Sequence, residues 1–462
     1  MKRAENSDGQ TTDHRVNEAT ANSILSARRR LIILALVFLI ALGVRLLNWH
    51  DAGNDALAVQ SSVALNYKHL AELLRTNGLS SLYDKSSTTS NPDLLGHPPG
   101  YPILLSVIYS IAGESAGATQ LLQITLDSVS VVIIMLIAFE LVPAPVGLIG
   151  GLMAAFAPQF SWNSLTLLPD SLSSLPILLA LLLIARSLKK PTWLSLLLAG
   201  ALIGVSVWLR ANALLLAPFV ALIFLFSSRR ERRLPAALAL VAGALLVIAP
   251  LTIRNALVFG KFIPVSLGAG QTLLEGLADY NSDGSLGLPA TDQELLRGEA
   301  DTFQRPDYAN SLFTPDGVAR DRARVARGVA VIRTHPIWFF GVMLRRAASM
   351  LRLERTPLRL SSPSAGLIGR QVRLVQKLFI TVIFLPLVLL GAALLAYRRE
   401  FQKLALLLVV PFYYFCTQSA LHTEYRYVLV IHYFLFMLAG VAVYSIACKI
   451  LIARRMYREA VS

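Results

Sequence analysis

Continuous apolar runs of 16–26 residues recur along the chain, and they constrain its fold more than any other feature. A helix needs roughly 20 apolar residues to cross the hydrocarbon core of a membrane. The composition agrees, because 15% of the residues are charged, whereas soluble domains carry about 25%. The runs do not alternate between apolar and polar residues, which excludes a closed β-barrel. We therefore expect an all-α, polytopic transmembrane helix bundle.

Ten runs are candidate membrane spans, at residues 31–48, 118–141, 145–160, 168–187, 192–209, 211–227, 234–252, 372–397, 402–420 and 427–450. Cytoplasmic loops carry an excess of Lys and Arg, so Arg28–Arg30 place the N-terminus in the cytoplasm. With ten spans the remaining basic clusters and the C-terminus are cytoplasmic as well. These clusters lie at Arg186, Lys189–Lys190, Arg229–Arg233, Arg398–Arg399 and Arg454–Arg455. Residues 49–117 and 253–371 are then on the outer face.

Two further apolar segments, 99–113 and 336–350, affect the number of spans. A crossing by residues 99–113 would reverse every later loop and expose the basic clusters on the outer face. The segment is also short and begins at a Pro-Pro pair. We therefore expect both segments to be interfacial helices that lie along the outer surface of the membrane.

The chain divides into four regions along this topology. Residues 1–27 are polar and predict a disordered cytoplasmic tail, and the apolar run after them lacks a cleavage site and predicts an uncleaved first span. Residues 28–265 form the membrane core, with its first outer loop at 49–117. Residues 266–371 are an outer-face region of loop (276–317) and amphipathic helix (318–334). Residues 372–462 hold the C-terminal spans and a basic tail.

Several classes of function are not indicated. The net charge is +15, but the basic residues cluster at span ends, and no aromatic-rich basic module for nucleic acid accompanies them. Cys416 and Cys448 lie near opposite ends of different spans, which argues against a disulfide. The sequence has no phosphate-binding glycine loop and no zinc-ligand spacing. It predicts no metal ligands and leaves a divalent-metal requirement open.

Two carboxylates on the outer face are candidates for catalysis. Asp55 follows the first span in a Gly-Asn-Asp turn that we expect to open a helix over about 56–77. It is either a helix cap, favoured by the helix dipole, or a catalytic base, and Asp51 is a weaker candidate. Asp170 begins the fourth span after Leu168-Pro169. A carboxylate near the bilayer is costly unless it caps the helix or belongs to a site.

Three arginines, Arg210, Arg254 and Arg426, lie at outer span ends, where positive charge is disfavoured. They either extend to lipid head groups or bind an anion, for which the planar guanidinium is suited. His97, in a proline-rich turn, is either structural or contacts a substrate. Asp127, within a span, is either a satisfied bundle residue or part of an ion path.

These segments together resemble the C-type (GT-C) integral-membrane glycosyltransferases, which include protein O-mannosyltransferases, aminoarabinose transferases and lipopolysaccharide-core galacturonosyltransferase-like bacterial enzymes. The similarity covers about 45–265, and each motif by itself is loose. The matching segments are Gly53-Asn54-Asp55, His97-Pro98-Pro99-Gly100-Tyr101-Pro102, Leu168-Pro169-Asp170, Trp208-Leu209-Arg210-Ala211-Asn212 and Pro250 through Arg254-Asn255 to Phe262, with an echo in Glu424-Tyr425-Arg426-Tyr427. Two departures are Ala211, where the family pattern has Pro, and one acid at Asp55, where the mannosyltransferases carry a pair.

The resemblance implies a glycosyltransferase that uses a polyprenyl-phosphate-linked sugar as donor substrate, with no certain cofactor, and inverts the anomeric carbon. Its acceptor hydroxyl would belong to a lipid, glycan or protein. The enzyme would lie in a bacterial inner or plasma membrane, with its site on the extracytoplasmic face. Asp55 would be the general base and Asp170 would orient the acceptor or the base. The expected substrate contacts are His97, Tyr101, Arg210, Arg254, Glu424 and Arg426.

Three other readings remain open at this stage. An O-antigen ligase or polymerase also uses polyprenyl donors and outer-loop arginines. A secondary transporter of an organic anion is a second possibility, although the sequence shows no inverted repeat of broken helices. A scaffold subunit without activity is the third, because only one acid stands at Asp55.

Overall fold

The computed structural model describes residues 8–85, 93–188, 192–227, 230–354 and 366–461. Within these ranges the chain consists of helices joined by turns, and no strand is present. The all-α fold predicted from the apolar runs is therefore confirmed.

Each predicted span corresponds to a helix. These helices are α1 (Asp8–Leu57), α6 (Ala116–Leu141), α7 (Ala144–Phe156), α9 (Asp170–Ser187), α10 (Trp193–Leu209), α11 (Leu216–Ser227), α12 (Arg230–Phe259), α18 (Thr381–Tyr397), α19 (Phe401–Thr417) and α20 (Leu429–Val461). Six helices in the described residues are long and apolar enough to cross a membrane, or seven if one bent pair counts as a span. The helices α7, α10 and α11 are apolar but shorter.

The bent pair corrects the span expected at 372–397. There the chain forms α17 (Leu367–Gln376) and then α18, with a 60° bend between them. Arg373 and Gln376 of α17 are buried, whereas Leu367 and Ile368 are exposed. The helix therefore turns its polar side chains towards the protein, a pattern that continuous hydropathy does not reveal.

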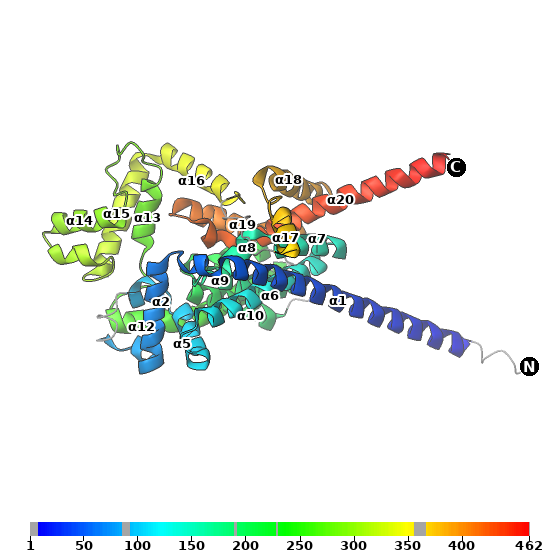
Figure 1. The fold of residues 1–462 in the computed structure, drawn as a ribbon, viewed down its shortest axis with the longest axis horizontal. Coiled ribbons are helices and arrows are strands. Elements are labelled where there is room, and N and C mark those ends of the chain that lie inside the picture. The colour runs from blue at the N-terminus through cyan, green and yellow to red at the C-terminus, as the bar shows by residue number, and fades with distance from the viewer. Residues whose placement is uncertain (1–7, 86–92, 189–191, 228–229, 355–365, 462) are drawn as a thin grey trace, which may run out of the picture.

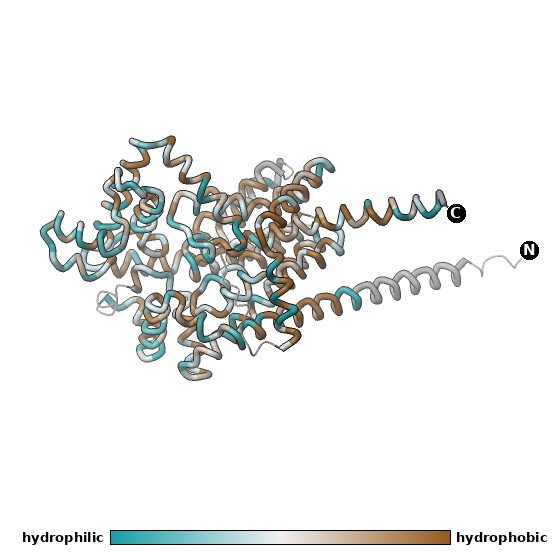
Figure 2. The backbone as a smooth tube through the Cα atoms, turned by 45° about the horizontal axis from the view of Figure 1, so that its top comes forward, coloured by the Kyte–Doolittle hydropathy of each residue, from teal (hydrophilic) through white to brown (hydrophobic). Residues whose placement is uncertain are grey.

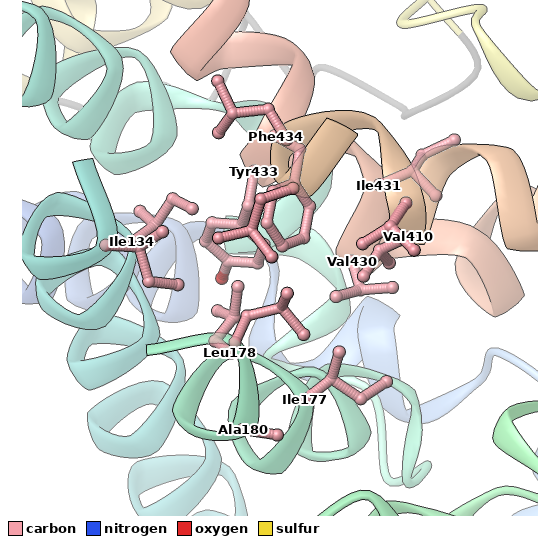
Figure 3. Packing of buried hydrophobic residues seen from close by; sticks show 14 of the residues in the cluster. Ile134, Ile177, Leu178, Ala180, Val410, Val430, Ile431, Tyr433 and Phe434 are labelled. Atoms are coloured by element: carbon pink, nitrogen blue, oxygen red, sulfur yellow. The ribbon is translucent and has the colours of Figure 1, made fainter. Parts of the chain in front are cut away.

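The core of the bundle forms where α6, α9, α19 and α20 meet. Figure 3 shows side chains from all four helices packed together, among them Ile134, Leu178, Val410 and Tyr433. Close helix contact elsewhere depends on glycine. A Cβ on Gly200 of α10 would lie 1.8 Å from the Leu240 carbonyl oxygen of α12. Small residues let helix backbones approach this closely in membrane proteins.

A buried ion pair crosses the core between α1 and α6. Arg45 lies 2.6 Å from Asp127 through Nη2 and donates from Nε at 2.7 Å. The Tyr433 hydroxyl donates to the other Asp127 oxygen at 3.0 Å. Asp127 is therefore a satisfied bundle residue, the first of the two readings that its sequence position allowed.

The segments that the sequence predicts on the outer face, called the outer-face segments below, gather at the end of the molecule opposite both termini (Figures 1 and 2). They comprise α2 (Ser61–Asn77), η1 (Leu79–Leu82), α4 (Asp93–Gly96), α5 (Gly100–Ala112), α13 (Ala269–Ala278), α14 (Asp292–Phe303), η3 (Pro306–Asn310), α15 (Gly317–Thr334) and α16 (Pro336–Met350). The amphipathic helix expected at 318–334 is confirmed as α15. The loop expected at 276–317 is wrong in part, because α14 is helical and packs against η3.

One further sequence expectation needs correction at the N-terminal end. The helix α1 begins at Asp8, residues 1–7 lie outside the described ranges, and the disordered cytoplasmic tail at residues 1–27 stays a prediction. The helix expected over 56–77 is two helices, because α1 ends at Leu57 and Gln60 takes a left-handed conformation (φ 51°) before α2 begins. Asp55 is therefore in the last turn of α1 and does not cap a helix N-terminus.

Candidate functional site

A buried carboxylate, Asp170, forms the centre of the candidate site. It occupies the first turn of α9 and is 2% exposed. Arg210, which ends α10 in an extended conformation, places Nε 3.1 Å from Asp170 Oδ1. Arg426, from the turn before α20, places Nη1 3.8 Å from Asp170 Oδ2. Three motifs that are far apart in the sequence thus meet at one carboxylate.

Glu424 orients the second of these arginines. Arg426 donates to it from Nε and Nη2, both at 2.8 Å, in a bidentate arrangement. Such paired charge-assisted bonds fix a guanidinium in a plane. Gln60, at the break between α1 and α2, approaches Glu424 at 3.5 Å. The sequence motif Glu424-Tyr425-Arg426 is therefore part of the same cluster as Asp170.

Within the described part of the chain, the cluster retains polar atoms that form no hydrogen bond. Both Asp170 oxygens and Arg426 Nη1 are buried and form no hydrogen bond to the described residues. The two arginines balance the charges of Asp170 and Glu424 if all four are ionised. Burying polar atoms without hydrogen bonds is costly. The arrangement can therefore bind a group that donates a hydrogen bond to Asp170, or an acceptor, such as an anion, that takes the N–H of Arg426.

A group of rings from the first outer loop lies beside the charged cluster. The ring centroid of Tyr67 in α2 lies 5.1 Å from that of His97 and 5.2 Å from that of Tyr101. Burial raises the pKa of Tyr67 to about 12, although Arg210 acts in the opposite direction. Burial, and secondarily Arg210, lowers the pKa of His97 to about 4. The imidazole is therefore neutral at physiological pH, and it cannot contribute positive charge to an anion site.

The Pro-Pro-Gly-Tyr segment has a clear structural role next to His97. A Cβ on Gly100 would lie 2.5 Å from the Trp208 carbonyl oxygen, so glycine lets α5 begin against the end of α10. Tyr101 is fully buried and donates its hydroxyl to Gln123 at 2.8 Å. The segment therefore positions α5 and His97 beside the turn that carries Arg210.

Asp55 lies in the last turn of α1, shortly before the break at Gln60. It is partly buried, and its carbonyl oxygen accepts a hydrogen bond from Ala58 at the break that leads to Gln60. Neighbouring Ala56 packs with Ile124 and Leu165. Its role as a base stays a prediction.

Arg254 has partners different from those expected. It is 2% exposed and donates to the carbonyl oxygens of Leu82 and Leu94 at 2.8 and 3.0 Å, and to Asn255 at 2.7 Å. These bonds hold η1 and α4 of the first outer loop against α12. Arg254 thus holds this loop in place, whereas Arg210 and Arg426 lie at Asp170. Among the described residues, Arg254 Nη2 is buried without a hydrogen bond, and its contact with substrate stays a prediction.

Asp51 also has a partner, and this contact accounts for its buried carboxylate without a catalytic role. It forms an ion pair with Arg373 of α17 and contacts His50 at 3.2 Å. Among the described residues, no group of three or more His, Cys, Asp or Glu side chains is arranged to hold a metal ion.

Two site residues, Tyr67 and Tyr427, were not singled out from the sequence. The Tyr427 ring centroid lies 4.1 Å from the Arg210 Cζ atom and 5.0 Å from the Arg426 Cζ atom. Its position directly after Arg426 was visible, but an aromatic residue beside an arginine is common in membrane helices. Tyr67 carried no distinguishing signal, because it lies in an ordinary amphipathic helix.

Residues 96–253, which include His97, Asp170 and Arg210, match the family described as dolichyl-phosphate-mannose-protein mannosyltransferase. No curated protein sequence matches the chain at a significant level.

Solved structures are similar over most of the chain. An archaeal oligosaccharyltransferase, AglB from Archaeoglobus fulgidus, in complex with an inhibitory peptide and a dolichol-phosphate, matches with a TM-score of 0.52 and 14% identity, over 94% of this chain and 52% of that chain. The apo oligosaccharyltransferase from Archaeoglobus fulgidus gives 0.54 and 15% identity, over 93% and 52%. The chain thus spans about half the length of these proteins. ArnT from Cupriavidus metallidurans, bound to undecaprenyl phosphate, matches with a TM-score of 0.31 and 14% identity, over 83% and 78%.

Proposed function

We propose that this chain, a membrane protein of the GT-C fold, transfers a sugar from a polyprenyl-phosphate donor to an acceptor hydroxyl at the outer end of its helix bundle. The observation that carries the proposal is the meeting of Asp170, Arg210 and Arg426 in one buried cluster. The family match contains two of these three residues. The similar oligosaccharyltransferase, whose fold the chain shares, was solved with a dolichol-phosphate.

The chemistry requires a base for the acceptor and positive charge for the leaving group. In the proposed step the acceptor hydroxyl gives its proton to Asp55, and its oxygen bonds to the anomeric carbon. The bond from that carbon to the phosphate oxygen breaks, and the lipid phosphate leaves with the electron pair. Arg210 and Arg426 stabilise the charge that develops on this phosphate, and Asp170 orients the two guanidinium groups.

The bundle also suits a lipid donor. A polyprenyl chain needs apolar surface that leads from the membrane to the site. The apolar spans supply such surface, and the charged cluster lies at the end of α9, α10 and α20. The proposed face is the extracytoplasmic one, since the termini and basic loops at the opposite end suit the cytoplasm.

Replacement of Asp55 by Asn tests the general base. The amide keeps the shape of the side chain but cannot accept a proton from the hydroxyl, and a base contributes typically 10²–10⁴-fold to rate. We expect Asp55→Asn to fold, to bind the donor lipid and to lose sugar transfer by at least about a hundredfold. The assay uses purified protein with labelled donor lipid and scores retained donor and transferred sugar separately.

Asp283→Asn is the matched control, since Asp283 is an exposed carboxylate of the outer region; it should transfer sugar at the wild-type rate. Unchanged transfer in Asp55→Asn would end the assignment of the base. Solute uptake by the wild type in vesicles, without any sugar transfer, would favour the transporter. Assembly of a glycan polymer would favour the ligase or polymerase.

A further inference from the structure

One aromatic ring, that of Tyr427, contacts both arginines of the candidate site. The Arg210 and Arg426 Cζ atoms lie 4.1 and 5.0 Å from its centroid. Arg426 Nη2 also approaches the Tyr427 hydroxyl at 3.3 Å. Like charges on two guanidinium groups repel, and the electron-rich face of a ring offsets this by attracting each of them. Tyr427 thus holds two positive groups close together.

The backbone of Tyr427 joins the same two turns. Asn212, two residues after Arg210, donates from Nδ2 to the Tyr427 carbonyl oxygen at 2.9 Å. The Asn212 carbonyl in turn accepts from the Tyr413 hydroxyl at 2.7 Å. The turn after α10 and the turn before α20 are therefore locked together at Tyr427. A change in its side chain should alter the guanidinium positions without releasing this backbone contact.

A second tyrosine, Tyr308, also lies beneath two arginines and provides a comparison with Tyr427. Arg305 and Arg320 both lie over the Tyr308 ring, at 4.8 and 4.3 Å. There both guanidinium groups donate hydrogen bonds to other partners. Arg305 donates to Asp307, and Arg320 donates to Glu299 and to backbone carbonyl oxygens.

At Tyr427, in contrast, one of the two arginines, Arg426, leaves one N–H group without a hydrogen bond among the described residues. In the described part of the chain, Arg426 Nη1 and both Asp170 oxygens are buried without a hydrogen bond. Arg426 is 6% exposed, so its unsatisfied N–H points into the protein and away from bulk water. Tyr427 therefore lies beside two guanidinium groups, and one of them, that of Arg426, has an N–H group still available to donate a hydrogen bond.

We infer that Tyr427 is a positioning residue that fixes Arg210 and Arg426 to receive a single phosphate ester, and that its ring, more than its hydroxyl, does this. The inference rests on the proposed function, because a polyprenyl phosphate is the ligand that it names. It assigns to Tyr427 a share in donor affinity and no part in proton transfer.

The test compares variants of Tyr427 in the full chain. Binding of farnesyl phosphate in detergent micelles is measured by calorimetry and gives the Kd. Sugar transfer is measured with the labelled donor lipid as substrate and gives kcat and KM. Tyr427→Leu and Tyr427→Met remove the ring; we expect the Kd for farnesyl phosphate and the donor KM to rise about tenfold, as loss of two cation–π contacts predicts. Because the same two arginines stabilise the leaving phosphate, kcat at saturating donor should fall as well, so that kcat/KM for the donor falls by more than about tenfold. Tyr427→Phe keeps the ring and should bind within about threefold of wild type.

Tyr308→Leu is the matched control, because it removes a ring beneath two arginines away from the site; it should leave Kd unchanged. If both aliphatic variants bind as wild type does, the inference is overturned, while sugar transfer by the wild type keeps the proposed function. A Phe variant as weak as the Leu variant, or a loss confined to kcat, also overturns it. If the wild type does not bind farnesyl phosphate, the inference about Tyr427 is also overturned. The proposed function is tested separately, by sugar transfer. If Tyr427→Leu does not fold, Tyr427→Met, which is unbranched, supplies the same comparison.

Discussion

Two buried arginines at the outer end, Arg254 and Arg426, take different roles although both sit at the end of a span. Arg254 directs two guanidinium nitrogens to carbonyl and amide oxygens of the first outer loop and α12. Arg426 binds Glu424 and faces Asp170. The partners of Arg254 are mainly backbone carbonyl oxygens, which it holds in place. The partners of Arg426 are carboxylates, and its guanidinium can also bind a ligand.

Loss of the Arg254 side chain should therefore reduce stability and not donor affinity. Arg254→Met leaves the Leu82 and Leu94 carbonyl oxygens without their donor, and hydrogen bonds to charged groups contribute about 1.5–3 kcal/mol each. We expect a loss of about 2–5 kcal/mol in the free energy of unfolding, measured by thermal denaturation in detergent. A variant of wild-type stability with weakened donor binding would instead support the phosphate contact expected from the sequence.

At the scale of elements, α13 is docked on the segment that leads to Glu424. A Cβ on Gly276 would lie 2.4 Å from the His422 nitrogen, and the His422 N–H donates to the Thr272 carbonyl oxygen at 2.7 Å. Arg346 of α16 donates to the carbonyl oxygens of Ser419 and Gly276. The outer-face helices thus support the turn that holds Arg426, through an interface lined by titratable groups.

This docking should weaken as pH rises. The hydrogen bond to Asp279 raises the pKa of His422, and burial, with a smaller contribution from Asp292, raises the pKa of Glu275 to about 7. A raised folded-state pKa means that the docked state binds the proton more tightly. Its stabilisation is complete below the unfolded pKa values, at about 4.5 for Glu275 and 6.5 for His422, and is lost as pH passes the folded values.

Hydrogen exchange of residues 269–278 measures this effect. We expect protection, corrected for intrinsic exchange, to be lower at pH 8.5 than at pH 5.5. Glu275→Gln keeps a neutral side chain at both pH values and should reduce the difference. Protection that increases with pH would contradict the prediction.

At the scale of the whole molecule, both termini lie at one end and the outer-face helices at the other (Figure 1). Termini at the same end require an even number of crossings, and the ten-span topology stays a prediction of this kind. Which end faces the cytoplasm follows from the charge bias of the loops.

Single-cysteine labelling decides the orientation. After replacement of Cys416 and Cys448 by Ser, a cysteine is introduced at exposed Thr192 or exposed Ser285. We expect a membrane-impermeant maleimide added to intact cells to label the variant at 285 and not the variant at 192. The reverse pattern would place the candidate site in the cytoplasm.

The sequence by itself determined the class of the molecule and the positions of its apolar helices, because run length and loop charge are local properties of the chain. It also identified Asp170, Arg210, Glu424 and Arg426, since charges at outer span ends are conspicuous. The tertiary structure decided how these residues are paired. The separation of Arg254 from the cluster depends on contacts with Leu82 and Leu94, which lie 172 and 160 residues away in the sequence. The joining of two arginines at Tyr427 depends on a contact between turns that lie 215 residues apart. The helix break at Gln60 and the bend before α18 were likewise decided by packing, because neither position carries a glycine or proline that would mark it in the sequence.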